Sequence, residues 1–359
     1  MSSIDRFADI HARLAAAEAT LASIGQSLSP LVAELDIAVL IPARDNAETI
    51  GAVVSQFRAA LPEARVYVYD NNSRDTTATA AREAGAVVRR EPMPDSDQIR
   101  ARMLADVEAD IYILADAEGL HDPADAPRLV TRMIETQADM AVAARITPEK
   151  SLYPSKERVL PAVLKGVYGD RFTDAHSAYR AVSRRFAKSY PAGAFCRLGE
   201  TGFALHALDL GMTISEIQSV CRTPDLAAPS KRERAASAFR NLIAGFGVVR
   251  DYRPLATYGA MAGMCALAAI AATLFGAPGL AGGVGLLALA SLGAGGVLDS
   301  LRHTRQENRR MVFNQVESLP AKLERLAQTR SRINDVRNGA RAERAAQDLT
   351  RPMPLRRTH

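Results

Sequence analysis

The stretch Asp110-Ile-Tyr-Ile-Leu-Ala-Asp-Ala-Glu-Gly-Leu-His-Asp-Pro123 decides the fold of this 359-residue chain. Its apolar run, residues 111–115, has the length and β-branched content of a buried strand, and two carboxylates, Asp116 and Glu118, follow it. Ligands of open α/β sheets bind at the carboxyl ends of strands, so these acids are expected in a ligand crevice. Oxygen ligands suit a hard cation such as Mg²⁺ or Mn²⁺ that holds a diphosphate. An ordinary acidic loop is the alternative.

Strand and helix patterns alternate around this stretch. Strands are expected at residues 37–41, 66–69, 87–88, 111–115 and 140–143. Helices are expected at residues 49–60, 76–84, 98–107 and 127–136. This alternation predicts an α/β fold with a mostly parallel sheet and helices on both of its faces.

Composition limits the kinds of partner. The net charge is +5, Trp is absent, and aromatic residues make up 5% of the chain, so we expect no nucleic-acid partner. Arginines crowd residues 222–253 and the segment after 302, a distribution that suits an anionic membrane surface. The three cysteines, Cys196, Cys221 and Cys265, form no C-x-x-C pair, so neither a disulfide framework nor a zinc knuckle is expected.

Residues 254–298 contain no charged side chain. They predict a transmembrane hairpin at 255–299, with spans at 255–275 and 280–298, because each span is long enough to cross a bilayer. Arginines flank both ends and are absent from the turn, which places both ends in the cytoplasm. The small residues of the spans would also let the hairpin pack against copies of itself, giving a homo-oligomer. A buried helical hairpin of a soluble protein is the alternative.

The segments outside these regions are assigned from their amphipathic patterns. Residues 1–36 predict an amphipathic helix that packs on the main domain or on a second subunit, and they do not resemble a signal peptide. Residues 229–254 predict an interfacial juxtamembrane helix, or else a helix packed on the globular domain. Residues 300–359 form a basic cytoplasmic tail, expected to be solvated or partly disordered, with a short coiled coil as the alternative.

Several motifs then resemble one family. They are Ile41-Pro42-Ala43, Val68-Tyr-Asp-Asn-Asn-Ser-Arg-Asp-Thr76, Asp116-Ala117-Glu118 and Phe172-Thr-Asp-Ala-His-Ser-Ala-Tyr-Arg180. Together with Ser230-Lys231 and the hairpin, they resemble the family 2 glycosyltransferases, and specifically the polyprenyl-phosphate and dolichol-phosphate hexosyltransferases. The resemblance implies a Rossmann-like GT-A domain at 37–228, followed by the interfacial helix and the two transmembrane helices.

The resemblance also implies a role for each motif residue. Pro42, Asp70 and Asp116 would bind the nucleotide-sugar, and Asp116 and Glu118 would ligate Mg²⁺ or Mn²⁺. Glu118 and Asp174 would be catalytic, with Asp174 near the reacting centre. The lipid phosphate would contact Ser177, Arg180, Arg222 and Lys231. The loop histidine His121 is expected to be structural, with a ligand role beside the acid pair as the alternative.

The implied activity is the inverting transfer of a hexose from a nucleotide-sugar to polyprenyl (undecaprenyl) phosphate. The reaction would take place at the cytoplasmic face of the inner membrane. The protein itself would be an integral membrane enzyme of cell-envelope glycan synthesis. Residues 95–97 read Asp-Ser-Asp where the family carries Gly-Lys-Gly. That difference favours the alternative, a weak or inactive relative that binds nucleotide or lipid as the partner of another glycan enzyme. A nucleotidyltransferase on a similar sheet is a third hypothesis.

Overall fold

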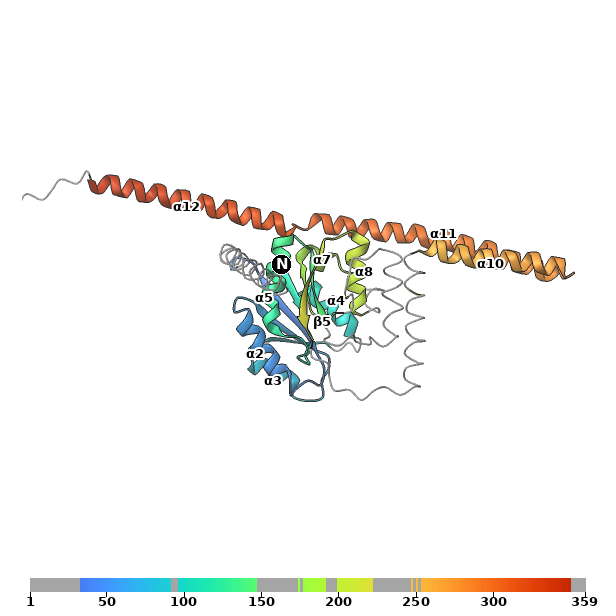
Figure 1. Ribbon diagram of the computed structural model, residues 1–359, viewed down its shortest axis with the longest axis horizontal. Helices are drawn as coiled ribbons and strands as arrows, with labels where there is room; N and C mark the ends of the chain where they lie inside the picture. Colours follow the sequence, from blue (N-terminus) through green and yellow to red (C-terminus); the bar gives the residue numbers. More distant parts are fainter. Residues whose placement is uncertain are drawn as a thin grey trace, which may run out of the picture. The chain divides into compact units, whose positions relative to one another are not determined.

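The structure, a computed structural model, describes residues 33–91, 96–146, 174, 177–191, 199–221, 247, 250 and 253–349 (Figure 1). The chain divides into two compact units. One unit is Ile37–Val316, and the other combines Met1–Asp36 with Glu317–His359. Residues 1–32 of the expected helix at 1–36, and most of the expected interfacial helix at 229–254, lie outside the described residues.

A mixed sheet forms the centre of the first unit. In the described part its order is β3-β2-β1-β4-β6-β5-β7. Its strands are β1 (Ile37–Ala43), β2 (Arg65–Asp70), β3 (Val87–Arg90), β4 (Ile111–Leu114), β5 (Met140–Ile146), β6 (Arg180–Ser183) and β7 (Ile214–Val220). Strand β1 pairs in parallel with β2 and β4, whereas β6 runs antiparallel to β4 and β5. The expected α/β class with a mostly parallel sheet is confirmed.

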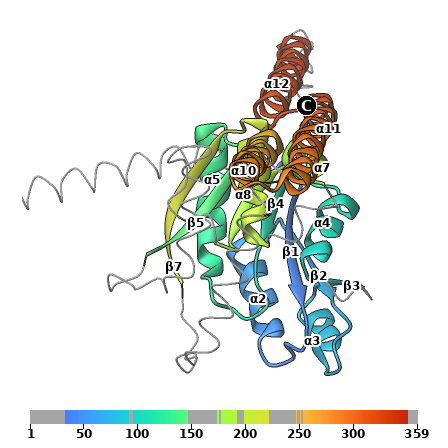
Figure 2. The same cartoon turned by 90° about the vertical axis from the view of Figure 1, so that its right-hand side faces the viewer.

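Helices cover both faces of the sheet. One face carries α2 (Ile50–Ala60), α3 (Thr77–Glu83) and α5 (Ala126–Thr136), and the other carries α4 (Ser96–Asp106), α7 (Arg184–Ser189) and α8 (Glu200–Leu210) (Figures 1 and 2). Strand β1 is buried along almost its whole length, as expected for a central strand with helices above and below it. Helix α5 buries Leu129, Val130, Met133 and Ile134, the apolar stripe that its spacing predicts.

Two long apolar helices follow, α10 (Pro254–Leu274) and α11 (Pro278–Gln315), and they pack side by side (Figure 1). Both are long and apolar enough to cross a membrane, and only 6% of each apolar window is buried. A Cβ atom at Gly295 would lie 2.8 Å from Cβ of Tyr258, so a glycine is needed where the two helices touch. The core helix of a soluble protein would be mostly buried, whereas in the part of the chain that the structure describes these two helices are mostly exposed.

The helix that carries the second predicted span continues beyond residue 298, because α11 ends at Gln315. Residues 299–315 contain neither glycine nor proline, so nothing in the sequence breaks the helix there. In the other unit, α12 (Leu319–Leu349) is a long helix, and the expectation of a solvated tail stays a prediction.

Candidate active site

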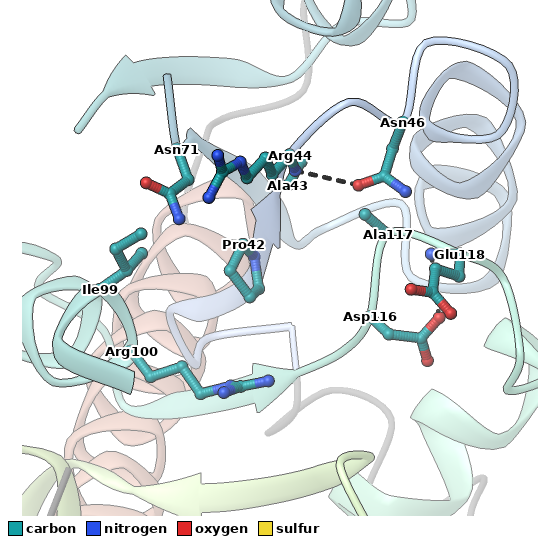
Figure 3. A pocket seen from close by; sticks show the side chains of 10 residues that line it. All are labelled: Pro42, Ala43, Arg44, Asn46, Asn71, Ile99, Arg100, Asp116, Ala117 and Glu118. Atoms are coloured by element: carbon teal, nitrogen blue, oxygen red, sulfur yellow. Dashed lines mark hydrogen bonds between the residues drawn. The ribbon is translucent and has the colours of Figure 1, made fainter. Parts of the chain in front are cut away.

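A pocket of about 210 Å³ opens at the carboxyl ends of β1 and β4 (Figure 3). Its lining residues are Pro42, Ala43, Arg44, Asn46, Asn71, Ile99, Arg100, Asp116, Ala117 and Glu118. The position is the crevice that parallel α/β sheets use for ligands. Three residues predicted from the sequence, Pro42, Asp116 and Glu118, therefore meet in one pocket.

The carboxylate of Asp116 builds the turn that carries Glu118. Its Oδ1 accepts hydrogen bonds from the backbone N–H groups of Glu118 and Leu120, each at 3.1 Å. Gly119 has a φ of 72°, a conformation that glycine adopts without strain. The hydroxyl of Thr49 donates to the Ala117 carbonyl at 2.7 Å, which ties the turn to the start of α2. The turn therefore places two carboxylates side by side in the pocket (Figure 3).

His121 lies behind this pair. Its Nε2 is 3.9 Å from Oδ2 of Asp116, and its ring lies 5.3 Å from the ring of Tyr179. Burial lowers the pKa of His121, which outweighs the opposing effect of Asp116. Burial therefore favours the neutral form of this imidazole.

The acid pair fits a divalent cation bound together with a substrate. Among the described residues, no group of three or more His, Cys, Asp or Glu side chains could hold a metal ion. Mg²⁺ and similar ions, however, are commonly bound by one or two carboxylates together with substrate phosphates and water. Asp116 and Glu118 supply those two carboxylates, so the donor set suits a metal that arrives with a diphosphate.

Two loops beside the pocket are tied together by hydrogen bonds. Asp45 and Asn72 both have a φ of 52°, in the left-handed region that Asp and Asn tolerate better than most residues. Oδ1 of Asp45 accepts from the N–H of Arg74 at 2.7 Å, and the Asp45 N–H donates to Oγ of Ser73 at 3.0 Å. These bonds hold the segment that carries Arg44 and Asn46 in one conformation.

Asp70 lies at the end of β2, where the sequence predicts it, but its side chain is buried. Oδ1 accepts from the N–H of Ser73 at 3.3 Å, so the carboxylate orders the loop that follows. The neighbouring Asn71 lines the pocket instead. The contact between Asp70 and a nucleotide base stays a prediction.

Two pocket cations, Arg44 and Arg100, are absent from the sequence-based candidates. Nη2 of Arg100 lies 2.9 Å from Oε1 of Glu200, the first residue of α8. Oε2 of the same carboxylate lies 3.2 Å from Nη2 of Arg180. An arginine on a helix carries no local signal of ligand binding, so only the tertiary structure brings Arg100 to the acid pair.

Arg180 and Ser177 are both 0% exposed. Arg180 lies 5.2 Å from the ring of Phe203 and pairs with Glu200, and burial lowers its pKa. Oγ of Ser177 lies 3.3 Å from the backbone N and O atoms of Tyr179. In this geometry both side chains anchor β6 inside the domain. Their contact with a lipid phosphate stays a prediction, and it would require them to become accessible.

Asp174 is also buried, at 7% exposure, and forms a two-pronged ion pair with Arg145. Nε and Nη2 of Arg145 donate to its two carboxylate oxygens at 2.7 and 3.0 Å. Such a pair fixes the carboxylate in position. The other two expected phosphate contacts, Arg222 and Lys231, lie outside the described residues.

Comparisons with known proteins agree with this architecture. The family model described as "Glycosyl transferase family 2" matches residues 38–190. Protein RfbJ of Shigella flexneri is 39% identical over 110 residues, covering 31% of this chain and 85% of that protein. The low-salt glycan biosynthesis hexosyltransferase Agl6 of Haloferax volcanii is 29% identical over 168 residues, covering 43% of this chain and 41% of Agl6. The crystal structure of glucosyl-3-phosphoglycerate synthase from M. tuberculosis has a TM-score of 0.48 at 21% identity, covering 62% of this chain and 85% of that one.

Proposed function

This chain belongs to glycosyl transferase family 2, and we propose that it transfers a hexose from a nucleotide-sugar to polyprenyl phosphate at a membrane surface. The observation that carries the proposal is the turn at Asp116 and Glu118, which presents two carboxylates in a pocket at the strand ends. The similarity to Agl6, a hexosyltransferase of glycan biosynthesis, supports a hexose as the transferred group.

The residues of the pocket suggest how the donor is held. Asp116 and Glu118 would bind Mg²⁺ or Mn²⁺, which supplies positive charge to the diphosphate as it leaves. Arg44 and Arg100 line the same pocket and add positive charge around a diphosphate. Pro42 and Asn71 would form the wall against which the nucleoside lies.

The acceptor proposal rests on the apolar hairpin. Large side chains of α10 and α11 face outward, with Leu267 at 70%, Leu274 at 82% and Leu286 at 69% exposure. Such a surface suits a bilayer, where a polyprenyl phosphate resides. A lipid phosphate is already ionised near neutral pH, so attack on the sugar needs no strong general base. Asp174, held by Arg145, would then orient groups near the reacting centre.

The charge pattern suggests the orientation. Arg253 precedes α10, and Arg302, Arg305 and Arg309 follow the apolar half of α11. The positive-inside rule places both ends of the hairpin in the cytoplasm. The pocket would therefore face the cytoplasmic side of the inner membrane, where nucleotide-sugars are made.

The test uses the full chain in lipid nanodiscs with Mn²⁺, undecaprenyl phosphate and a panel of radiolabelled nucleotide-sugars. We expect a lipid-linked sugar from at least one donor. Asp116→Asn retains a side-chain oxygen that can accept the hydrogen bonds of the turn, but it loses the negative charge. We expect both Asp116→Asn and Glu118→Gln to lower the rate of sugar transfer by about 100-fold or more. Glu48→Gln removes an exposed acid that does not line the pocket, and should leave transfer unchanged. No lipid-linked product from any donor would refute the proposal.

A further inference from the structure

The charged half of α11 lies against the catalytic domain along one face. Within residues 301–313 the partly buried side chains are Arg302, Gln306, Arg309 and Phe313, and the others are exposed. The steps of four, three and four residues place these side chains on one stripe of the helix. A stripe of this kind marks the side of α11 that packs on another element.

Asp209, near the end of α8, is the centre of that contact. Its side chain is 2% exposed, and its Oδ2 lies 3.2 Å from Nη1 of Arg309. Arg302 lies 3.8 Å from the other carboxylate oxygen, and the side-chain amide of Gln306 donates to the Asp209 carbonyl at 2.9 Å. Three residues of the α11 stripe therefore meet one buried acidic residue.

A second contact lies at the far end of the stripe. The guanidinium of Arg185, on α7, lies 4.5 Å from the centre of the Phe313 ring. Arg185 is itself held by Asp139, whose Oδ2 accepts from Nη2 at 2.6 Å. The charged half of α11 is thus fixed to both α7 and α8.

The same helix α8 reaches the pocket at its other end. Its first residue, Glu200, pairs with Arg100, which lines the pocket beside the acid pair. This 11-residue helix spans about 16 Å. Asp209 near its end contacts α11 and Glu200 at its start contacts the pocket residue Arg100, so one rigid element connects α11 to the pocket. Displacement of α11 would therefore change where the pocket stands relative to the hairpin.

We propose that Asp209 is a positioning residue, which locks α11 to the catalytic domain and so fixes the pocket relative to the bilayer for attack by a membrane-embedded acceptor. The proposal rests on the proposed function. Asp209 does not line the pocket, so its loss should spare donor binding and impair use of the lipid.

The first test measures the position of the pocket without any reaction. A fluorescent amino acid replaces the exposed Glu48, and the full chain is placed in nanodiscs that carry an acceptor dye on the lipid headgroups. We expect one dominant efficiency of fluorescence energy transfer for the parent chain. After Asp209→Asn or Arg309→Gln, we expect a lower energy-transfer efficiency or a broader distribution of efficiencies. Arg305→Gln, an exposed arginine of the same helix, is the control and should change nothing. An unchanged energy-transfer efficiency in both test variants would overturn the proposal.

The second test measures the reaction in the same nanodiscs. We expect Asp209→Asn to lower the rate of transfer to undecaprenyl phosphate by about tenfold, while the nucleotide-sugar KM stays within about twofold. The double variant Asp209→Asn/Arg309→Gln should be no worse than Asp209→Asn alone, because both changes remove the same contact. Two results would overturn the positioning role. One is a displaced pocket with an unchanged rate of sugar transfer to the lipid, and the other is a rise in the nucleotide-sugar KM as large as the fall in that rate.

The two proposals fail in different ways. If the parent chain makes no lipid-linked sugar, the proposed function fails, and the energy-transfer measurement still decides whether Asp209 fixes the pocket. If the parent chain is active and both test variants match it in both measurements, the positioning role alone fails.

Discussion

His206 gives a quantitative prediction about the pH dependence of stability. It lies in α8 at 0% exposure, with its ring 5.1 Å from Phe186 and its Nε2 3.0 Å from Oγ of Ser189. Burial, and to a smaller extent the nearby Arg309, lowers the pKa of His206 to about 3. The folded protein therefore keeps this imidazole neutral at every pH where the enzyme is expected to work.

The direction of the pH effect on stability follows from the pKa values of His206 in the folded and in the unfolded chain. In the unfolded chain the group titrates near its ordinary value of about 6.5, so the unfolded chain takes up the proton first as the pH falls. The contribution of His206 to stability is therefore complete above about pH 6.5, and it is lost progressively as the pH falls toward 3. Between pH 7 and pH 5 the loss amounts to about 2 kcal/mol.

The assay compares thermal unfolding of the full chain in nanodiscs at pH 7 and pH 5, with and without His206→Gln. Glutamine keeps a polar group near Ser189 but does not titrate. A loss of about 2 kcal/mol corresponds to about 4–8 °C in a domain of this size, so the parent Tm should fall by that much more than the variant Tm. His303→Gln alters an exposed histidine and should keep the parent behaviour. Equal pH dependence in the parent and His206→Gln would refute the reasoning.

Three further predictions concern the site and the membrane. Arg180→Met removes one of the two arginine partners of Glu200 and should lower the free energy of unfolding by about 1–3 kcal/mol in thermal melts. Unchanged stability with lost lipid transfer would instead indicate a direct phosphate contact. Gly119→Ala forces alanine to a φ of 72° and brings its Cβ to 3.3 Å from Val53, so it should cost about 1–2 kcal/mol and raise the donor KM. Gly211→Ala meets similar strain away from the pocket, and should lower stability without a change in KM. The protein should stay with membranes through a high-salt wash, and complete release would contradict the two-span interpretation.

Local patterns were enough to predict the first half of the sheet. Strands β1, β2 and β4 and helices α2 and α5 lie within one or two residues of their expected ranges, because an apolar run or a regular apolar stripe marks each of them. Strand β6 was missed because Arg-Ala-Val-Ser is short and begins with a cation. Arg180 is buried there, and one of its partners, Glu200, lies on α8 outside the local sequence.

The candidate site was predictable where a residue directly follows a strand. Asp116 and Glu118 fall in the pocket for that reason, and Pro42 reaches it from within the last two residues of β1. Arg100 reaches the same pocket from a helix, and its position depends on how α4 packs on the sheet. Asp209 could not be predicted either, because its partners lie on α11, about a hundred residues further along the chain.

If the apolar half of α11 spans a bilayer as proposed, the unbroken course of this helix makes the join between membrane and catalytic domain sensitive to the rotation of the helix about its axis. Leu298, at the end of the apolar half, and Arg302, the first residue of the stripe, belong to one uninterrupted helix. Each added residue turns everything beyond it by about 100°, so a single insertion between them would point Arg302, Gln306 and Arg309 away from Asp209. Seven inserted residues return the stripe to within about 20° of its original direction, while the domain moves about 10 Å further from the bilayer. Chain length at this join therefore sets two quantities separately, the direction of the pocket and its height above the lipid.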